Sequence, residues 1–355
     1  MDMFDYIKSQ PSILSKIIEN RKEITKNFVD IYKENNIKGI TIIGSGSSFN
    51  SSSAAKYFME KLLKVKVNVI YPYTFNNYEN ILDKDEIFIT VSQGGKSTAT
   101  IDSVKKCNKL GLINITLTSE KICPLRDVAK AVVNIACGEE TVGYKTKGYT
   151  STILTLYLLA LETAYALKKI NNEEYDLYIK EIEEAVCNID NIIAETDSWY
   201  KTNKDDLVNA ENVMVVGYGP NYGTALEGRL KLNETAKISV ICHELEEFMH
   251  GPQLSLNEEY YLFFVASSGA GYERIKNLYN YVSNVTKHSY LIQDKENETK
   301  DQRILRASFS RYEEINPIEY IIPFQVLAYR MSNGKGIDLG IKKFPDFYSK
   351  LGVKC

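Results

Sequence analysis

The sequence predicts an α/β protein of two domains, each with a parallel β-sheet that carries helices on both faces. Two observations lead to this prediction. Short apolar runs rich in β-branched residues alternate with amphipathic helical segments along most of the chain, and the order of motifs in the first half returns in the second. With 355 residues, 44% hydrophobic and 25% charged, the chain has the length and composition of two ordinary globular domains.

Glycine turns define the repeat. The segments GITIIGSGSSF and NVMVVGYGPNY each read as an apolar strand, a glycine turn and the start of a helix, and their glycines Gly44 and Gly217 are 173 positions apart. A second pair of strand ends carries Gly95 and Gly269, separated by 174 positions. Two independent landmarks with nearly the same offset indicate an internal duplication.

The apolar runs predict nine strands, five in the first half and four in the second. They are expected at 39–44, 65–73, 86–92, 112–119, 131–138, 212–217, 237–243, 260–267 and 288–294. Parallel sheets of this kind bind ligands at the carboxyl ends of their strands.

Between the halves, a segment with apolar residues at helical spacing predicts a long connecting helix and not a disordered linker. We therefore expect a first domain at 25–170, the connecting helix at 171–200, a second domain at 201–333 and a basic tail at 334–355.

Composition argues against several classes of partner. A net charge of −3 gives no basic surplus for nucleic acid. No apolar run reaches about 18 residues, and the start MDMFDYIKSQ is acidic where a signal peptide is positive. The most apolar segment, TILTLYLLALETAYAL, contains Glu162 and is expected to be a buried helix. Six cysteines scattered without CxxC spacing indicate reduced thiols in a cytoplasmic protein.

We expect neither a cofactor nor a metal. The turns GSGSSF and GYGPNY begin like a dinucleotide-binding fingerprint, but Phe49 and Tyr222 stand where its third glycine belongs. The segment QGGKST ends like a P-loop, but Thr90 stands at the first glycine of that motif. In HELEEFMHGP the fourth residue after His243 is Glu247, so the spacing of a zinc-protease helix fails.

The segment SQGGKST follows a predicted strand and precedes a predicted helix. Ser92 and Ser97 supply hydroxyls, Gln93 supplies an amide, and Gly94 and Gly95 expose bare backbone. Backbone N–H groups and the dipole at a helix start favour an anion, and a monoester phosphate suits such a site. The alternative is a polar loop that only caps a helix.

Five motifs in order make the sequence resemble the double sugar-isomerase (SIS) domain family: GSGSSFNS, SQGGKST, KGYTST, ALEGRLKLNE and EEFMHGP. The nearest patterns are the isomerase half of glucosamine-6-phosphate synthase and the stand-alone fructosamine-6-phosphate deglycases. The likeness covers nearly the whole chain. It implies two flavodoxin-like SIS domains, a homodimer with shared active sites, and a small-molecule sugar phosphate as the ligand.

The resemblance also implies roles for individual residues. It places the sugar phosphate on a set of small polar residues, Ser47, Ser48, Ser92, Gln93, Gly94 and Ser97. The family often has Ser-Gly-Glu where this chain has Gly-Gly-Lys at 94–96, so phosphate contacts are expected to shift toward Lys96 or the backbone. A tail lysine reaches the sugar in the synthase, and Lys350 and Lys343 are the candidates here.

On the helix ALEGRLKLNE the resemblance implies that Glu227, Lys231 and Glu234 handle the sugar. Their spacing of i, i+4 and i+7 puts them on one helix face. Aldose–ketose interconversion moves a proton between C1 and C2 through an enediol and needs a carboxylate base, a role we expect for Glu234. Spacing alone favours the alternative that Glu227 and Lys231 form an exposed ion pair worth about 0.3–0.5 kcal/mol.

His250 falls on the family's catalytic histidine, which the resemblance places in the active site of the other subunit. It precedes Gly251 and Pro252, which end a helix and put the ring at a turn. Histidine titrates nearest neutrality and suits the proton transfer of ring opening. A capping or core histidine is the alternative, and His243 matches nothing in the family pattern.

The sequence therefore predicts a phosphosugar isomerase that acts on a hexose 6-phosphate or an amino-sugar 6-phosphate. The chain starts without the glutaminase domain of the synthase, so isomerisation or amine release is expected rather than synthesis of glucosamine 6-phosphate. A fructosamine-6-phosphate deglycase and a non-catalytic phosphosugar-binding sensor remain as alternatives.

Overall fold

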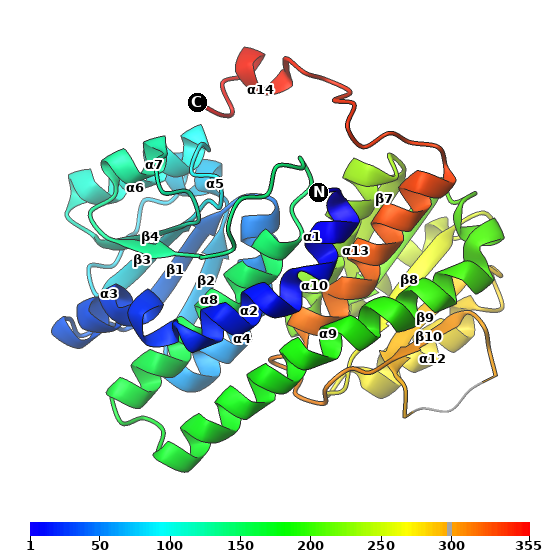
Figure 1. Ribbon diagram of the computed structural model, residues 1–355, viewed down its shortest axis with the longest axis horizontal. Helices are drawn as coiled ribbons and strands as arrows, with labels where there is room; N and C mark the ends of the chain where they lie inside the picture. The colour runs from blue at the N-terminus through cyan, green and yellow to red at the C-terminus, as the bar shows by residue number, and fades with distance from the viewer. Residues whose placement is uncertain (297–299) are drawn as a thin grey trace. The chain divides into compact units, whose positions relative to one another are not determined.

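The computed structural model describes residues 1–296 and 300–355 (Figure 1). The chain forms two compact units. We call residues 12–180 with 342–355 the amino-terminal unit, and residues 1–11 with 181–341 the carboxy-terminal unit. The segment expected to connect the two domains is a single helix, α9 (Asn172–Leu207), whose first turns belong to the former and whose remainder belongs to the latter.

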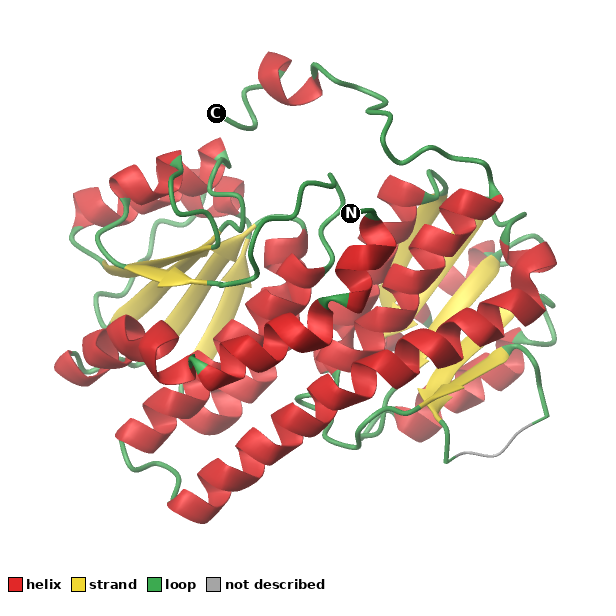
Figure 2. Cartoon of the chain, viewed as in Figure 1, coloured by secondary structure: helices red, strands yellow, loops and turns green. Residues whose placement is uncertain are grey.

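The amino-terminal unit contains a five-stranded parallel sheet in the order β2-β1-β3-β4-β5. Its strands are β1 (Gly39–Gly44), β2 (Lys66–Ile70), β3 (Glu86–Val91), β4 (Ile113–Thr118) and β5 (Val132–Asn134). Its helices are α2 (Gln10–Glu19), α3 (Arg21–Glu34), α4 (Ser47–Leu63), α5 (Pro72–Asn77), α6 (Thr98–Leu110), α7 (Pro124–Val128), α8 (Lys147–Ala166) and α14 (Phe347–Lys350). Figure 2 shows helices on both sides of the strands, which explains why the strands are apolar nearly throughout.

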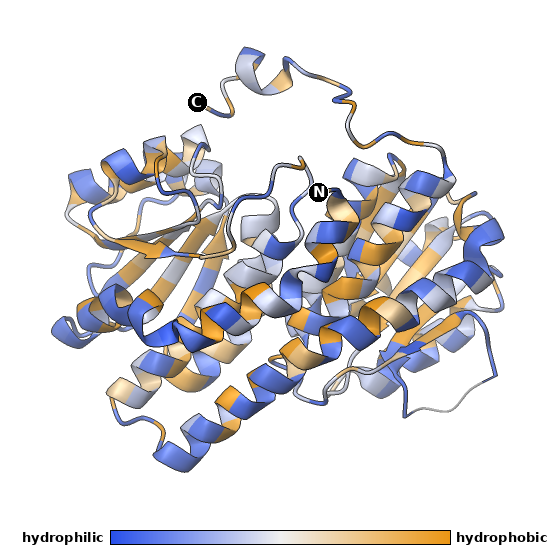
Figure 3. Cartoon of the chain, in the orientation of Figure 1, coloured by the Kyte–Doolittle hydropathy of each residue, from blue (hydrophilic) through white to orange (hydrophobic). Residues whose placement is uncertain are grey.

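The carboxy-terminal unit contains a second five-stranded parallel sheet, in the order β7-β6-β8-β9-β10. Its strands are β6 (Asn212–Gly217), β7 (Ser239–Glu244), β8 (Tyr261–Ala266), β9 (Ser289–Asp294) and β10 (Ile304–Ala307). Its helices are α1 (Met3–Lys8), α10 (Pro220–Thr235), α11 (Leu245–Phe248), the 3₁₀ turn η1 (Pro252–Ser255), α12 (Tyr272–Val282) and α13 (Pro317–Gly334). Much of both sheets carries the apolar colour in Figure 3.

Both sheets follow the order 2-1-3-4-5, counted within each unit, which is the flavodoxin-like order. The predicted α/β class and the predicted pair of flavodoxin-like domains are therefore confirmed. The direction in which successive strands are added to the sheet reverses between β1 and β3 in one unit and between β6 and β8 in the other. Ligands of doubly wound sheets bind at this switch point, outside the carboxyl ends of the strands.

Three local expectations were wrong. The strand expected at 65–73 ends at Ile70, because Pro72 occupies the first position of α5. The strand expected at 131–138 covers only 132–134. The sequence analysis also missed β10, a four-residue strand at the edge of its sheet whose apolar pattern is interrupted by Arg306.

The apolar segment that contains Glu162 is the buried helix α8, as predicted. Glu162 is accommodated because Arg21 and Tyr175 reach its carboxylate, at 3.2 Å and 2.5 Å. Among the described residues, no helix is long and apolar enough to cross a membrane.

Candidate functional site

The predicted phosphate loop is a tight turn between β3 and α6. Its first residue, Ser92, donates its backbone N–H to the carbonyl of Leu117 at 3.0 Å, and the N–H of Gly95 returns to the carbonyl of Ser92 at 3.1 Å. Gly95 has φ +61°, and a Cβ there would lie 2.2 Å from the Sγ of Cys123. Only glycine fits this position, for both backbone and space. At Gly94 a Cβ would meet no described atom within 4 Å, so the backbone is open there.

The Gln93 amide ties this loop to the segment before α8. Its Nε2 donates to the Sγ of Cys137 at 3.3 Å and to Oε2 of Glu140 at 3.4 Å. The other carboxylate oxygen of Glu140 accepts from both the N–H and the hydroxyl of Thr146, at 2.7 Å each. A Cβ on Gly148 would lie 2.2 Å from Oε1 of Gln93. The KGYTST motif therefore contributes a glycine that makes room for the Gln93 side chain.

The predicted serines of the first glycine turn lie at the start of α4, the helix that follows β1, the strand next to β3. Gly46 opens the helix with φ +56°, and the N–H of Ser48 donates to the carbonyl of Ser45 at 3.2 Å. Ser47 and Ser48 are both half-buried. Because β1 and β3 pair in the sheet, the starts of α4 and α6 flank the same switch point. The amino-terminal unit thus brings the predicted phosphate residues to one edge.

The C-terminal tail pairs with the phosphate loop. Lys354 forms an antiparallel bridge with Ser97, and the N–H of Cys355 donates to the carbonyl of Lys96 at 3.1 Å. By contrast, Lys350 is exposed and forms an ion pair with Asp346 at 2.5 Å. The tail lysine whose backbone lies at the loop is therefore Lys354, which the sequence analysis did not name.

The three charged residues predicted on α10 form one cluster. The ammonium of Lys231 lies 3.3 Å from Oε1 of Glu227 and forms a close ion pair with Oε1 of Glu234. The side chains of Glu227 and Lys231 are 0% and 1% exposed, and that of Glu234 is 28% exposed. The shared helix face predicted from spacing is therefore present. The alternative, an exposed ion pair, is wrong, because the side chains of Glu227 and Lys231 are buried.

Close packing against α13 fixes the position of α10. A Cβ on Gly228 would lie 2.7 Å from the ring of Phe324, so glycine is needed for this approach. Near the end of the helix, the hydroxyl of Thr235 donates to the carbonyl of Ala328 at 3.1 Å. These contacts hold the helix that carries the charged cluster.

The two histidines of HELEEFMHGP have different surroundings. His243 lies in β7, edge-on to the ring of Phe248, and burial lowers the pKa of its imidazole. His250 follows the end of α11, and its side chain is 69% exposed. Its Nε2 lies 3.6 Å from Glu246, which is held in turn by Arg274 through two hydrogen bonds of 2.7 Å. The expected turn before Gly251 is thus confirmed.

Glu234 and His250 lie at opposite edges of the same sheet. Helix α10 begins at the carboxyl edge after β6 and ends at the amino edge before β7, where Asn233 accepts the N–H of Val240. Glu234 stands about 20 Å along this helix from its start, at a rise of about 1.5 Å per residue. His250 follows β7 and so lies near the carboxyl edge. One carboxy-terminal unit therefore does not bring the two side chains together.

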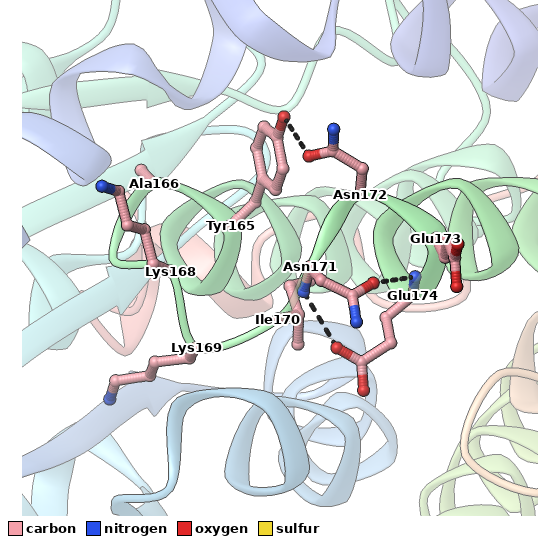
Figure 4. Close-up of a pocket in the computed structure, with 9 residues that line it drawn as sticks. All are labelled: Tyr165, Ala166, Lys168, Lys169, Ile170, Asn171, Asn172, Glu173 and Glu174. Carbon is pink, nitrogen blue, oxygen red and sulfur yellow. Dashed lines mark hydrogen bonds between the residues drawn. The ribbon is translucent and has the colours of Figure 1, made fainter.

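A surface pocket lies where α8 turns into α9, away from the predicted site (Figure 4). It is lined by residues 165, 166 and 168–174. Figure 4 shows Tyr165 bonded to Asn172, and the reciprocal pair of Asn171 and Glu174 that caps α9. Nearby, Lys169 donates to the carbonyl of the last residue of α4, at the amino edge of the sheet. None of the predicted site residues lines this pocket.

Within residues 1–296 and 300–355, no three His, Cys, Asp or Glu side chains are grouped so that they could hold a metal ion. The described sites offer hydroxyls, backbone amides, carboxylates, a buried ammonium and an exposed imidazole.

Comparison with known proteins identifies the family. The family model of the SIS domain matches the chain twice, at residues 32–172 and 206–331. The chain belongs to the SIS domain family. The two matches fall on the two parallel sheets, so the internal duplication is a duplication of SIS domains.

The chain is similar to curated glutamine–fructose-6-phosphate aminotransferases (isomerizing). It is 25% identical to that of Clostridium tetani over 348 residues, which is 95% of this chain and 57% of the relative. It is 24% identical to that of Bordetella pertussis over 94% of this chain and 55% of the relative. The chain thus spans a little over half the length of the curated relatives it matches.

Solved structures give the same fold. A proposed phosphosugar isomerase from Clostridium difficile 630 superposes with a TM-score of 0.92 at 28% identity, covering 100% of this chain and 99% of the other. The tagatose-6-phosphate ketose/aldose isomerase of Escherichia coli superposes with a TM-score of 0.73 at 16% identity, over 96% and 95% of the two chains. At that identity the second likeness concerns the fold alone.

Proposed function

We propose that this SIS protein is a phosphosugar isomerase that moves a proton between C1 and C2 of a hexose 6-phosphate or an amino-sugar 6-phosphate. The observation that carries the proposal is the cluster of Glu227, Lys231 and Glu234 on α10. A lysine that is 1% exposed costs several kcal/mol to desolvate, and charge pairs kept at this cost are common where chemistry is done. The curated relatives, which are isomerizing enzymes, support the same reaction type.

Each member of the cluster has a distinct role in this proposal. Glu234 is the base, because it is the more exposed of the two carboxylates, with an exposed fraction of 28% against 0% for Glu227, and so is open to a substrate carbon. Lys231 holds one of its oxygens and offers a positive charge to the negative enediolate. Glu227 is buried and fixes the ammonium of Lys231 from the other side.

The phosphate is anchored by the amino-terminal unit. Ser92, Gly94 and Ser97 line the open turn before α6, and Ser47 and Ser48 begin α4 at the same switch point. Donors at two helix starts favour a dianionic phosphate. Gln93 positions the turn through Glu140 and Cys137, and its amide also remains a candidate phosphate ligand.

His250 is proposed to complete the active site of a partner subunit in a homodimer. It lies at the opposite sheet edge from Glu234 within one unit, and its ring is exposed and available to a second chain. Mixing inactive Glu234→Gln with inactive His250→Asn under subunit exchange should restore one intact site in each mixed dimer. A mixture that stays inactive although mass spectrometry shows exchange would refute this shared site.

A substrate panel tests the proposed reaction. The protein is incubated separately with fructose 6-phosphate, glucosamine 6-phosphate and a fructosamine 6-phosphate, and each product is assayed. Glu234→Gln should lower turnover by ~10²-fold or more with little change in binding. The matched control, Glu273→Gln on the exposed surface of α12, should have no effect. Amine release from the fructosamine 6-phosphate would identify a deglycase. Binding of these sugar phosphates without conversion of any of them would indicate a non-catalytic sensor.

A further inference from the structure

The carboxy-terminal unit has a second loop of the same design as the phosphate loop. Ser267 is the first residue after β8, as Ser92 is the first residue after β3. The loop continues through Gly269, with φ +143°, to the start of the eleven-residue helix α12. Strand β8 pairs with β6, so this loop and the start of α10 flank the second switch point.

A carboxylate of the chain itself occupies this second switch point. A Cβ on Gly269 would lie 2.1 Å from Oε1 of Glu313, and a Cβ on Gly219 would lie 3.5 Å from the same oxygen. Gly219 belongs to the turn between β6 and α10, whereas Gly269 belongs to the turn between β8 and α12. The side chain of Glu313 therefore fills the space between the two glycine turns.

The amino-terminal unit has a counterpart of this residue whose carboxylate accepts hydrogen bonds. Glu140 stands six positions after the end of β5, and Glu313 stands six positions after the end of β10. Glu140 accepts the N–H and the hydroxyl of Thr146 at 2.7 Å each, and the amide of Gln93 in the phosphate loop at 3.4 Å. Among the described residues, no hydrogen bond to the carboxylate of Glu313 is found. The carboxylate of Glu140 is thus satisfied by hydrogen bonds, whereas the carboxylate of Glu313 only fills space.

The segment that carries Glu313 is nevertheless fixed. The buried carboxylate of Glu319 accepts the N–H of Ser310 at 3.0 Å, and Asn221 donates to the side chain of Asn316 at 2.7 Å. Ser268 in the loop after β8 also donates to the carbonyl of Arg311 at 3.1 Å. These bonds on both sides hold the segment against the loop.

Polar groups at this switch point are left unmatched. Ser267 is fully buried, and in the described part of the chain its hydroxyl has no hydrogen-bond partner. Burial, and then the neighbouring charge of Glu314, raise the pKa of Glu313. A buried hydroxyl without a partner and a desolvated carboxylate each cost free energy. Ser267 belongs to the loop after β8, and Glu313 lies against Gly269 of the same loop. Together they indicate a binding site that is closed rather than a loop optimised for stability.

We propose that the carboxy-terminal unit retains a second site for a phosphate-type anion, formed by Ser267 and the glycine turns, and that Glu313 keeps it closed. The chain then binds phosphate at the loop of the amino-terminal unit alone. The proposal rests on the proposed function only for that first site. Replacing Glu313 by alanine removes both the volume and the negative charge that exclude an anion.

The test is the stoichiometry of binding, measured by isothermal titration with inorganic phosphate and with fructose 6-phosphate. The unaltered protein should bind one equivalent per chain and Glu313→Ala should bind two. Glu314→Ala, which removes the adjacent carboxylate, should still bind one. In a Ser92→Ala, Ser97→Ala background, adding Glu313→Ala should create one site where none remained.

Unchanged stoichiometry in folded Glu313→Ala would overturn the proposal. So would loss of folding in that variant, because a side chain without hydrogen bonds to its surroundings would then be structural. Absence of phosphate binding by the unaltered protein would contradict the proposed first site, whereas one equivalent gained by Glu313→Ala would still support the second.

Discussion

Replacing Lys231 with methionine should both destabilise the carboxy-terminal unit and abolish activity. The change keeps the aliphatic stem but removes an ammonium that lies 3.3 Å from a carboxylate with 0% exposure. Breaking a buried ion pair on one side costs about 3–5 kcal/mol, because the other charge stays buried. For a unit of this size that corresponds to a fall in melting temperature of roughly 6–20 °C.

A second variant separates stability from function. Lys231→Met combined with Glu227→Gln removes both buried charges, so most of the lost stability should return. Activity should not return, because Glu234 still lacks the positive charge that orients it. The control is Lys201→Met: Lys201 is 73% exposed and pairs with Asp197 at 2.9 Å, so its loss should cost under about 1 kcal/mol.

Thermal unfolding and turnover of the best substrate in the panel are measured on all three variants. The reasoning is refuted if Lys231→Met unfolds no more readily than Lys201→Met. It is equally refuted if the double variant regains turnover along with stability, since the cluster would then serve only the fold.

Two further predictions concern the loop and the pH dependence of stability. Gly148→Ala places a methyl group 2.2 Å from the amide of Gln93 and should raise KM for a phosphosugar by displacing the loop. The control is Gly143→Ala, whose methyl group meets no described atom within 4 Å and should leave KM unchanged. Equal KM values for the two variants would contradict this prediction. Burial raises the pKa of Glu319 to about 7 from 4.5, so the folded state holds the proton of this carboxyl more tightly than the unfolded state does. The free energy of unfolding should therefore fall by roughly 3 kcal/mol as pH rises from about 4.5 to about 7. Glu319→Gln should flatten this slope in urea titrations, and an unchanged slope would show that other groups cause it.

The repeating pattern of the sequence was sufficient for the architecture. Apolar runs and glycine turns predicted both sheets, because buried parallel strands and the turns after them impose strong local constraints. Strand β10 was not predicted, because a four-residue edge strand that includes Arg306 carries little periodic signal. The pairing of Ser97 with Lys354 was not predicted either, since a contact across more than 250 positions leaves no local pattern in the sequence.

For the site, spacing predicted which side chains share a face but not how deeply they are buried. Glu227 and Lys231 are consistent with an exposed pair in sequence, and only the packing of α13 and its neighbours against α10 makes the pair a buried one. The position of Glu313 depends likewise on how the segment after β10 returns over the sheet.

Proton exchange at the substrate carbons tests the central claim most directly. The protein is incubated with fructose 6-phosphate or glucosamine 6-phosphate in D₂O, and deuterium at C1 and C2 is followed by NMR. The account predicts enzyme-dependent incorporation that Glu234→Gln slows by ~10²-fold or more, because that carboxylate removes and returns the proton. Incorporation at an undiminished rate in Glu234→Gln, or none with any phosphosugar of the panel, would contradict it.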